Sequence, residues 1–223
     1  KAGDISLRQK REGAITEQEI RDYKLTGCPS VGACTFLGTA STMQCMAEAL
    51  GLALPGAALI PATMRDILSW ARRAGRIIMK LAREDIRPGR IMTDKAFENA
   101  MMVHSAIGGS TNGVIHLTSI ARELGIELLP EMFDEINHKV PHIGNIAPGG
   151  SHLTEAFWFA GGVPMVELAL KDMLNLDVMT VTGKTLGENL DDLQRDGFFD
   201  RYTGYLSNCG LKREQVIFPV KDT

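Results

Sequence analysis

The stretch GCPSVGACTFLGTASTMQCMAEALG, residues 27–51, joins a loop rich in Gly and Pro to a segment of helix-forming composition. Two of the chain's four cysteines, Cys28 and Cys34, lie in that loop. They could form a disulfide, belong to a metal site, or be two small buried residues. The four cysteines are unevenly placed, and a chain of 223 residues can build a core without cross-links, so reduced thiols are favoured.

The loop places Cys34 just ahead of a predicted helix, which Thr39 or Ser41 could cap and which ends at Gly51. The free N–H groups and the positive dipole end of that helix stabilise a thiolate, which suits Cys34 to metal or iron–sulfur ligation. The spacing of the two loop cysteines is not a common zinc spacing, and two ligands do not make a site. Inside the helix, Cys45 is expected to be a buried small apolar residue.

A second segment with the same layout is GGSTNGVIHLTSIARELG, residues 108–125. A Gly-rich turn again precedes a Ser or Thr at the predicted cap and then a helix. The glycines would let a ligand approach the backbone, and Ser110, Thr111 and the first free N–H groups would bind a carboxylate or phosphate. A tight turn before a capped helix explains the motif equally well. His116 shares a helical face with Asn112 and could join a polar site or face solvent.

A long amphipathic helix is predicted over residues 64–81, where apolar side chains recur at helical spacing. Its other face carries a basic stripe formed by Arg65, Arg72, Arg76, Lys80 and Arg83. The stripe is most simply a solvated face, and the alternative is a surface that binds phosphate or a partner.

The remaining elements complete a helix-rich pattern. Helices are expected over residues 16–24, 94–107, 131–140, 154–174 in two parts, and 185–194, and strands over 177–183 and 215–220. His104 shares a helical face with Phe97 and Met101, which favours a hydrogen-bonded core histidine. The predicted fold class is α/β and helix-rich, with too few strands to close a sheet alone.

Composition limits the classes of function. With 44% hydrophobic and 23% charged residues, the chain can bury a core, and its formal net charge of −3 gives no general attraction to nucleic acid or to an anionic membrane. No apolar run approaches the roughly 20 residues that a spanning helix needs. We expect a cytoplasmic protein without nucleic-acid or membrane partners. The chain opens on Lys1 and stops within a strand-like run, so it is expected to be a fragment of a longer protein.

Three motifs, taken in order along the chain, resemble those of the dihydroxy-acid and sugar-acid dehydratases, a family that includes 6-phosphogluconate and aldonate dehydratases. They are CPSVGACTFLGTASTMQCMAEALGLALPG, AIGGSTNGVIHL and VMTVTGKTLGENL. The resemblance implies a helix-rich α/β N-terminal domain followed by a C-terminal β-barrel. It also implies an iron–sulfur cluster held by three cysteines, and a magnesium ion. Homo-oligomers, either dimers or tetramers, are implied as well.

In that pattern Cys34 is a cluster ligand, whereas Cys28 falls where family members vary and takes no assigned role. The family's Cys-Asp-Lys motif and its C-terminal barrel are not found in these 223 residues. The resemblance therefore makes residues 1–184 the C-terminal part of the dehydratase N-terminal domain, and residues 185–223 a connector towards the β-barrel. Because one ligand cannot hold a cluster, we expect the chain alone to bind no cofactor or metal and to be inactive, with no catalytic residue of its own.

The activity implied for the whole protein is dehydration of a 2,3-dihydroxy acid to a 2-keto acid, with Ser110, Thr111 and Asn112 on the substrate side. The segments MMVHSAIGGSTN and NIAPGGSH favour a sugar acid, an aldonate, as substrate. One alternative is the dihydroxy-acid dehydratase of branched-chain amino-acid synthesis. Another is a binding module that keeps the scaffold without the chemistry. A separate small enzyme with Cys34 as nucleophile is a more distant alternative.

Overall fold

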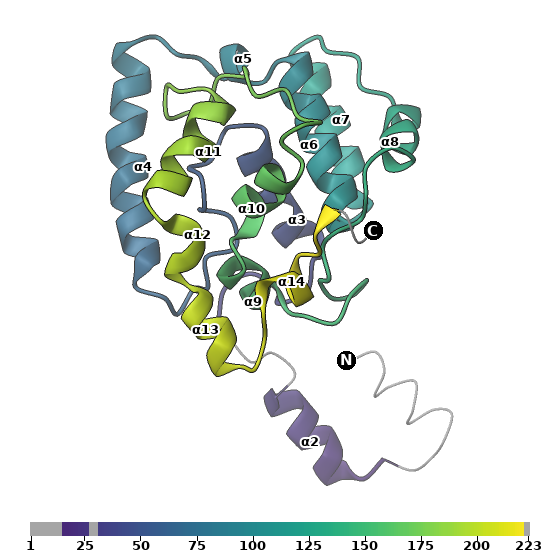
Figure 1. The fold of residues 1–223 in the computed structure, drawn as a ribbon. Helices are drawn as coiled ribbons and strands as arrows, with labels where there is room; N and C mark the ends of the chain where they lie inside the picture. Colours follow the sequence, from purple (N-terminus) through teal and green to yellow (C-terminus); the bar gives the residue numbers. More distant parts are fainter. Residues whose placement is uncertain (1–14, 27–30, 221–223) are drawn as a thin grey trace.

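The computed structural model describes residues 15–26 and 31–220, and nearly all of its regular structure is helical (Figure 1). In chain order the helices are α2 (Glu17–Thr26), α3 (Thr39–Ala49), α4 (Asp66–Arg83), α5 (Pro88–Ile91), α6 (Asp94–Ile107), α7 (Asn112–Glu123), α8 (Pro130–Asn137), α9 (Thr154–Phe159), α10 (Gly162–Ala169), α11 (Leu186–Arg195), α12 (Phe198–Arg201), α13 (Thr203–Asn208) and α14 (Arg213–Val216). The predicted helix-rich fold class is confirmed. Cys28, in contrast, lies outside the described residues.

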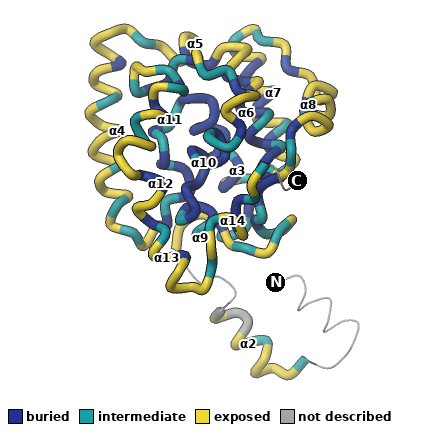
Figure 2. Tube along the Cα trace, viewed as in Figure 1, coloured by how far each residue is buried: buried dark blue, intermediate teal, exposed yellow. Residues whose placement is uncertain are grey.

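The helix α6 lies beside α7 (Figure 1), and α3, α8 and α10 pack against it. Its core-facing residues are buried (Figure 2). Its small and apolar residues recur at helical spacing, so Phe97 and Ala100 are almost completely buried. The Thr93 hydroxyl accepts a hydrogen bond from the Ala96 N–H at 3.4 Å, and Gly108 closes the helix with a left-handed φ of 64°. The helix predicted over residues 94–107 is confirmed.

The helix α3 runs beside α6 and carries Cys45 into the core with no exposed surface, as predicted. The predicted cap is wrong. Gly38 is the N-cap of α3, and no side chain caps the helix. Thr39 and Ser41 do not cap it because their hydroxyl groups are hydrogen-bonded to other segments, described below.

The strands predicted over residues 177–183 and 215–220 are also wrong. In the part of the chain that the structure describes, these segments form only single β-bridges, Met179 with Thr185 and Ile217 with Gly144. The first segment turns back on itself at Gly183, with a φ of 78°, and the second begins within the last turn of α14 (Arg213–Val216). Neither meets a neighbouring strand among the described residues, so their backbone groups bond to turns and loops instead.

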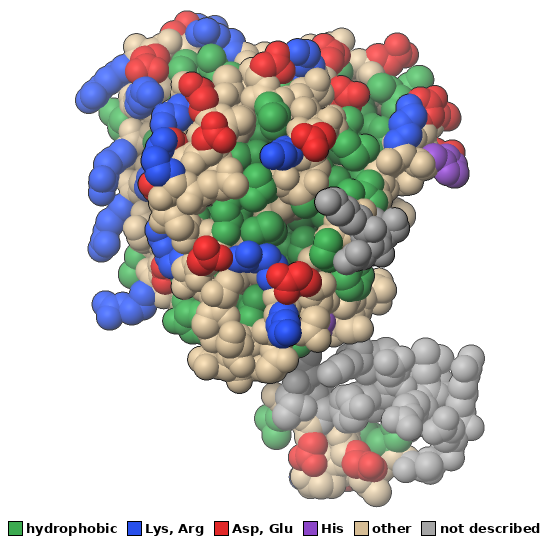
Figure 3. Space-filling view, in the orientation of Figure 1, with side chains coloured by type: hydrophobic (Ala, Val, Ile, Leu, Met, Phe, Trp, Pro, Cys, Tyr) green, Lys and Arg blue, Asp and Glu red, His purple; other side chains and the backbone are tan. Residues whose placement is uncertain are grey.

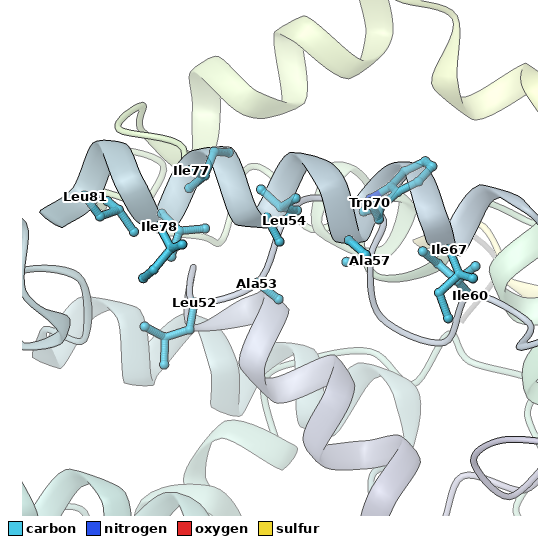
Figure 4. Close-up of a pocket in the computed structure, with 13 residues that line it drawn as sticks. Leu52, Ala53, Leu54, Ala57, Ile60, Ile67, Trp70, Ile77, Ile78 and Leu81 are labelled. Carbon is cyan, nitrogen blue, oxygen red and sulfur yellow. The ribbon is translucent and has the colours of Figure 1, made fainter. Parts of the chain in front are cut away.

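The helix α4 forms one edge of the molecule (Figure 1). The side chains of the basic stripe are exposed there and project from this edge in the space-filling view (Figure 3). This exposure agrees with the prediction of a solvated face. Leu81 is the one buried residue of α4, with 7% of its surface exposed, so the apolar face of the helix is only partly covered. A groove of about 470 Å³ lies between this face and the segment 52–60 (Figure 4).

Candidate functional site

The two Gly-rich motifs meet in the fold. The side chain of Asn112, the first residue of α7, donates to the Thr39 hydroxyl at the start of α3, with an Nδ2 to Oγ1 distance of 2.6 Å. The Ser110 N–H donates to the Thr42 hydroxyl at 3.0 Å. These bonds join residues about 70 positions apart in the sequence and place the positive ends of two helices side by side.

Cys34 lies in the loop that leads into α3, and it is exposed and not in a disulfide. Its carbonyl oxygen accepts a hydrogen bond from the Ser41 hydroxyl at 2.9 Å, which ties the loop to the first turn of the helix. The same loop is fixed from the other side, because the Leu37 N–H donates to the Ala147 carbonyl at 2.7 Å. The thiol is therefore carried on a segment that is bonded to two separate parts of the fold.

The imidazole of His104 packs against the second Gly-rich motif. It is 7% exposed, and its Nε2 lies 2.9 Å from the Ser110 carbonyl oxygen, which confirms the predicted hydrogen-bonded core histidine. Burial lowers the pKa of His104, and the bond to Ser110 offsets part of this shift. A Cβ at Gly109 would lie 2.4 Å from the Cδ2 atom of this ring, and one at Gly113 would lie 3.0 Å from it. These two glycines are explained by packing on His104, without any ligand.

The three residues predicted on the substrate side lie together at the start of α7. Thr111 and Asn112 are exposed, and Ser110 is partly buried. Thr111 is the N-cap by position, but its side chain makes no capping bond. His116 is exposed, so of its two predicted alternatives the structure shows the solvent-facing one.

The described residues do not form a metal centre by themselves. Among them, no three His, Cys, Asp or Glu side chains are grouped so that they could hold a metal ion. Cys45 is buried in the core, and Cys209 lies in the C-terminal part of the chain, after α13. The described part of the chain therefore offers Cys34 as a single exposed thiol near the two helix starts.

Sequence reasoning missed a pair of buried carboxyl groups, Glu48 on α3 and Glu167 on α10. The Glu48 carboxylate accepts hydrogen bonds from the backbone N–H groups of Gly56 and Ala58, both at 2.6 Å. Both glutamates line a cavity of about 10 Å³, together with Asn189 among others. The signal available in the sequence was that Glu48 stands one helical turn after Cys45, on the face predicted to be buried.

Burial is the main cause of the altered acidity of both groups. It raises the pKa of Glu48 to about 7, while hydrogen bonds from the backbone of residues 56–58 act in the opposite direction. It also raises the pKa of Glu167 well above its usual range, and the neighbouring Glu48 raises it further.

The sequence matches the dihydroxy-acid/6-phosphogluconate dehydratase N-terminal family over residues 4–189. This match covers most of the chain, which therefore belongs to that family.

Among its relatives are dihydroxy-acid dehydratases from Caldicellulosiruptor bescii, 45% identical over 182 residues, and from Acetivibrio thermocellus, 43% identical over 184 residues. Dihydroxy-acid dehydratase 1 of Methanosarcina acetivorans is 43% identical over 182 residues. These alignments cover 81 to 82% of this chain and 33% of each relative. The chain thus spans about a third of the length of these relatives.

Within the described residues, no helix has both the length and the apolar character needed to cross a membrane.

Proposed function

We propose that this chain is part of a hydro-lyase that dehydrates a 2,3-dihydroxy carboxylic acid to a 2-keto acid. The observation that carries the proposal is the meeting of two family motifs at one place, where Cys34 and the starts of α3 and α7 come together. Two helix starts side by side attract a carboxylate, which every such substrate carries.

The substrate we favour is the dihydroxy acid of branched-chain amino-acid synthesis. The relatives described above are named dihydroxy-acid dehydratases, and this supports the alternative interpretation of the sequence over the aldonate one. An aldonate remains the second candidate, on the segments MMVHSAIGGSTN and NIAPGGSH alone.

The roles we propose follow the geometry of the site. Cys34 would be one ligand of an iron–sulfur cluster, and Ser110, Thr111 and Asn112 would face the substrate. An exposed thiol on a loop bonded at both sides fits a ligand, and exposed polar groups at a helix start fit a carboxylate.

The described residues do not suffice for the cluster, because they offer one such thiol where the resemblance implies three. Further ligands would have to come from other parts of the protein, and magnesium is implied by the resemblance alone. We therefore propose that the chain alone holds no cluster and is inactive.

We further propose that the whole protein is cytoplasmic, that its partner is a small-molecule substrate, and that it assembles into dimers or tetramers. We also propose that residues 1–184 belong to the dehydratase N-terminal domain and that residues 185–223 lead towards a further domain. The family match ends close to this boundary, at residue 189, although Leu206 and Val216 pack into the same core as α6.

The test is to express the complete coding sequence that contains this chain and to assay it with dihydroxyisovalerate, xylonate, arabinonate and 6-phosphogluconate, measuring the 2-keto acid formed. We expect turnover of dihydroxyisovalerate. Preferential turnover of a sugar acid would show that the favoured substrate is wrong, and turnover of none would favour the binding module.

Cys34→Ser tests the ligand role in the same protein. We expect this variant to lose both the iron–sulfur absorbance and the activity, while Cys209→Ser, which changes another exposed cysteine, keeps both. A stoichiometric iron–sulfur chromophore in the purified 223-residue chain would contradict the view that this part holds no cluster alone.

A further inference from the structure

Asn112 is followed by Gly113, and this is the one Asn-Gly pair in the sequence. In such a pair the backbone nitrogen of the glycine can attack the side-chain carbonyl carbon of the asparagine. The new bond closes a succinimide ring, the bond from Cγ to Nδ2 breaks, and the side-chain nitrogen leaves as ammonia. Water then opens the ring to aspartate or isoaspartate. Glycine favours this reaction because it has no side chain beside the attacking nitrogen and tolerates many backbone angles.

The structure exposes Asn112 but holds both of the reacting groups. Asn112 is the first residue of α7, and its Nδ2 donates to the Thr39 hydroxyl at 2.6 Å. The Gly113 N–H donates to the Ser110 carbonyl oxygen at 2.8 Å. Ring closure requires the backbone of Asn112 to leave the helical region, so that the glycine nitrogen can reach Cγ. The folded start of α7 therefore keeps the pair unreactive.

A second set of contacts keeps the Gly113 peptide in place. Gly113 is buried, and a Cβ on it would lie 3.0 Å from the His104 ring and 3.2 Å from the Thr42 methyl group. The His104 Nε2 also lies 2.9 Å from the Ser110 carbonyl oxygen that accepts the Gly113 N–H. The glycine peptide is thus packed between α6 and α3 and cannot rotate towards Asn112 by itself. Reaction requires the first turn of α7 to open.

The start of α7 is a place where such opening costs little. Helix ends open at lower free energy than the centre of a core. Thr111 is the N-cap of α7, but its side chain makes no capping bond that would resist opening. In place of a cap, the bond from Asn112 to Thr39 ties the first residue of α7 to the first residue of α3. The same side chain is therefore both the reacting group and the tie.

We propose that Asn112 is a deamidation site that reacts when the start of α7 opens, and that its bond to Thr39 controls how often this happens. The reaction replaces an amide with a carboxylate where the two helix starts meet. This carboxylate repels a substrate carboxylate and competes with it for the free N–H groups, and isoaspartate also adds a carbon to the backbone. The loss of substrate binding rests on the proposed function, whereas the deamidation does not.

Incubation of the 223-residue chain at mildly alkaline pH, followed by peptide mass spectrometry that distinguishes asparagine, aspartate and isoaspartate, measures the reaction. We expect the folded chain to react at least about tenfold more slowly than the same chain in urea. Thr39→Val keeps the shape of the side chain but removes the acceptor, and it should speed the reaction of the folded chain about two- to tenfold, as loss of one hydrogen bond allows. In urea, Gly113→Ala should slow the reaction, because its methyl group hinders the attacking nitrogen.

The matched control is Thr203→Val, which changes a threonine that is also partly buried and also begins a helix, α13. It should leave the rate at Asn112 unchanged. Circular dichroism checks that each variant is folded, and Thr42→Val, which frees the Ser110 N–H, replaces Thr39→Val if the latter does not fold. The proposal is overturned if the folded and unfolded chains react equally fast, if the variant at the start of α7 reacts like the unmodified chain, or if Thr203→Val speeds the reaction as much.

Asn112→Asp in the complete protein tests the consequence for substrate binding. We expect the KM for the acid that the protein turns over to rise at least about tenfold, because two like charges at close range repel each other, while the iron–sulfur absorbance is kept. An unchanged KM would overturn the loss of substrate binding. Absence of turnover by the unmodified protein with every acid tested would overturn the proposed function together with this consequence, and the rates above would still decide whether Asn112 deamidates as proposed.

Discussion

The buried carboxyl pair gives the clearest quantitative prediction, through the variant Glu167→Gln. Glu167 is 4% exposed on α10. Burial first, and then the charge of Glu48, raise the pKa of the Glu167 carboxyl well above its usual range, which favours the protonated acid in the folded chain relative to the unfolded one. Folding is then coupled to the uptake of a proton by Glu167. The free energy of unfolding therefore falls as pH rises from the pKa of this carboxyl in the unfolded chain towards its pKa in the folded chain.

The magnitude follows from linkage. One proton taken up on folding changes the free energy of unfolding by about 1.4 kcal/mol per pH unit. Glutamine resembles the protonated acid in shape and does not titrate, so Glu167→Gln removes this slope. Above the usual carboxyl range, the stability of the variant relative to the unmodified chain should therefore rise with pH, by at most about 1.4 kcal/mol per pH unit. Burying the amide carries a cost that does not depend on pH. It changes the free energy of unfolding of the variant equally at every pH and leaves the pH dependence unaltered.

Urea unfolding followed by circular dichroism at pH 6.0, 6.75 and 7.5 measures this difference directly. Glu127→Gln, at an exposed position, is the matched control and should show no such slope. A constant offset between Glu167→Gln and the unmodified chain across these pH values would refute the reasoning. Glu48, with its pKa raised to about 7, contributes in the same sense between pH 4.5 and 7, by about 3 kcal/mol in total.

His104 acts with the opposite sign and does not disturb the comparison. Its pKa is lowered by burial, so as pH falls below its usual value of 6.5 the unfolded chain takes up a proton that the folded chain does not. Stability is then lost towards low pH. Because both proteins contain the same histidine, this effect cancels in the difference between them.

Helices whose ends carry local signals could be predicted from the sequence. The helix α6 begins at a threonine cap and ends at a left-handed glycine, and α11 begins with a capping box between Thr185 and Glu188. Such signals involve residues three or four apart, so they operate without knowledge of the rest of the fold. The two predicted strands lacked a comparable signal, because a short apolar run is equally consistent with a buried turn or helix.

The candidate site could be predicted only in part. Both motifs were recognised, but the bonds that join them link residues distant in sequence, such as Asn112 and Thr39. The glycines of the second motif suggested room for a ligand, whereas Gly109 is required by contact with His104 five residues earlier. The residue that a glycine contacts in space cannot be predicted from the glycine's position in the sequence, whereas the burial of Glu48 was indicated by its place one helical turn after Cys45.

Two further substitutions test how the second motif is held. Gly109→Ala places a Cβ 2.4 Å from the His104 ring and should lower the free energy of unfolding by about 1 to 3 kcal/mol, whereas Gly204→Ala, whose Cβ meets nothing within 4 Å, should not lower it. Thr42→Val keeps the shape of a fully buried side chain but removes the acceptor of the Ser110 N–H, at an expected cost of about 1 to 3 kcal/mol. The amide of Ser110 should then exchange its hydrogen faster, as measured by mass spectrometry. Unchanged exchange at this amide would mean that the Thr42 bond does not hold the two helix starts together, which would leave that role to the bond between Asn112 and Thr39.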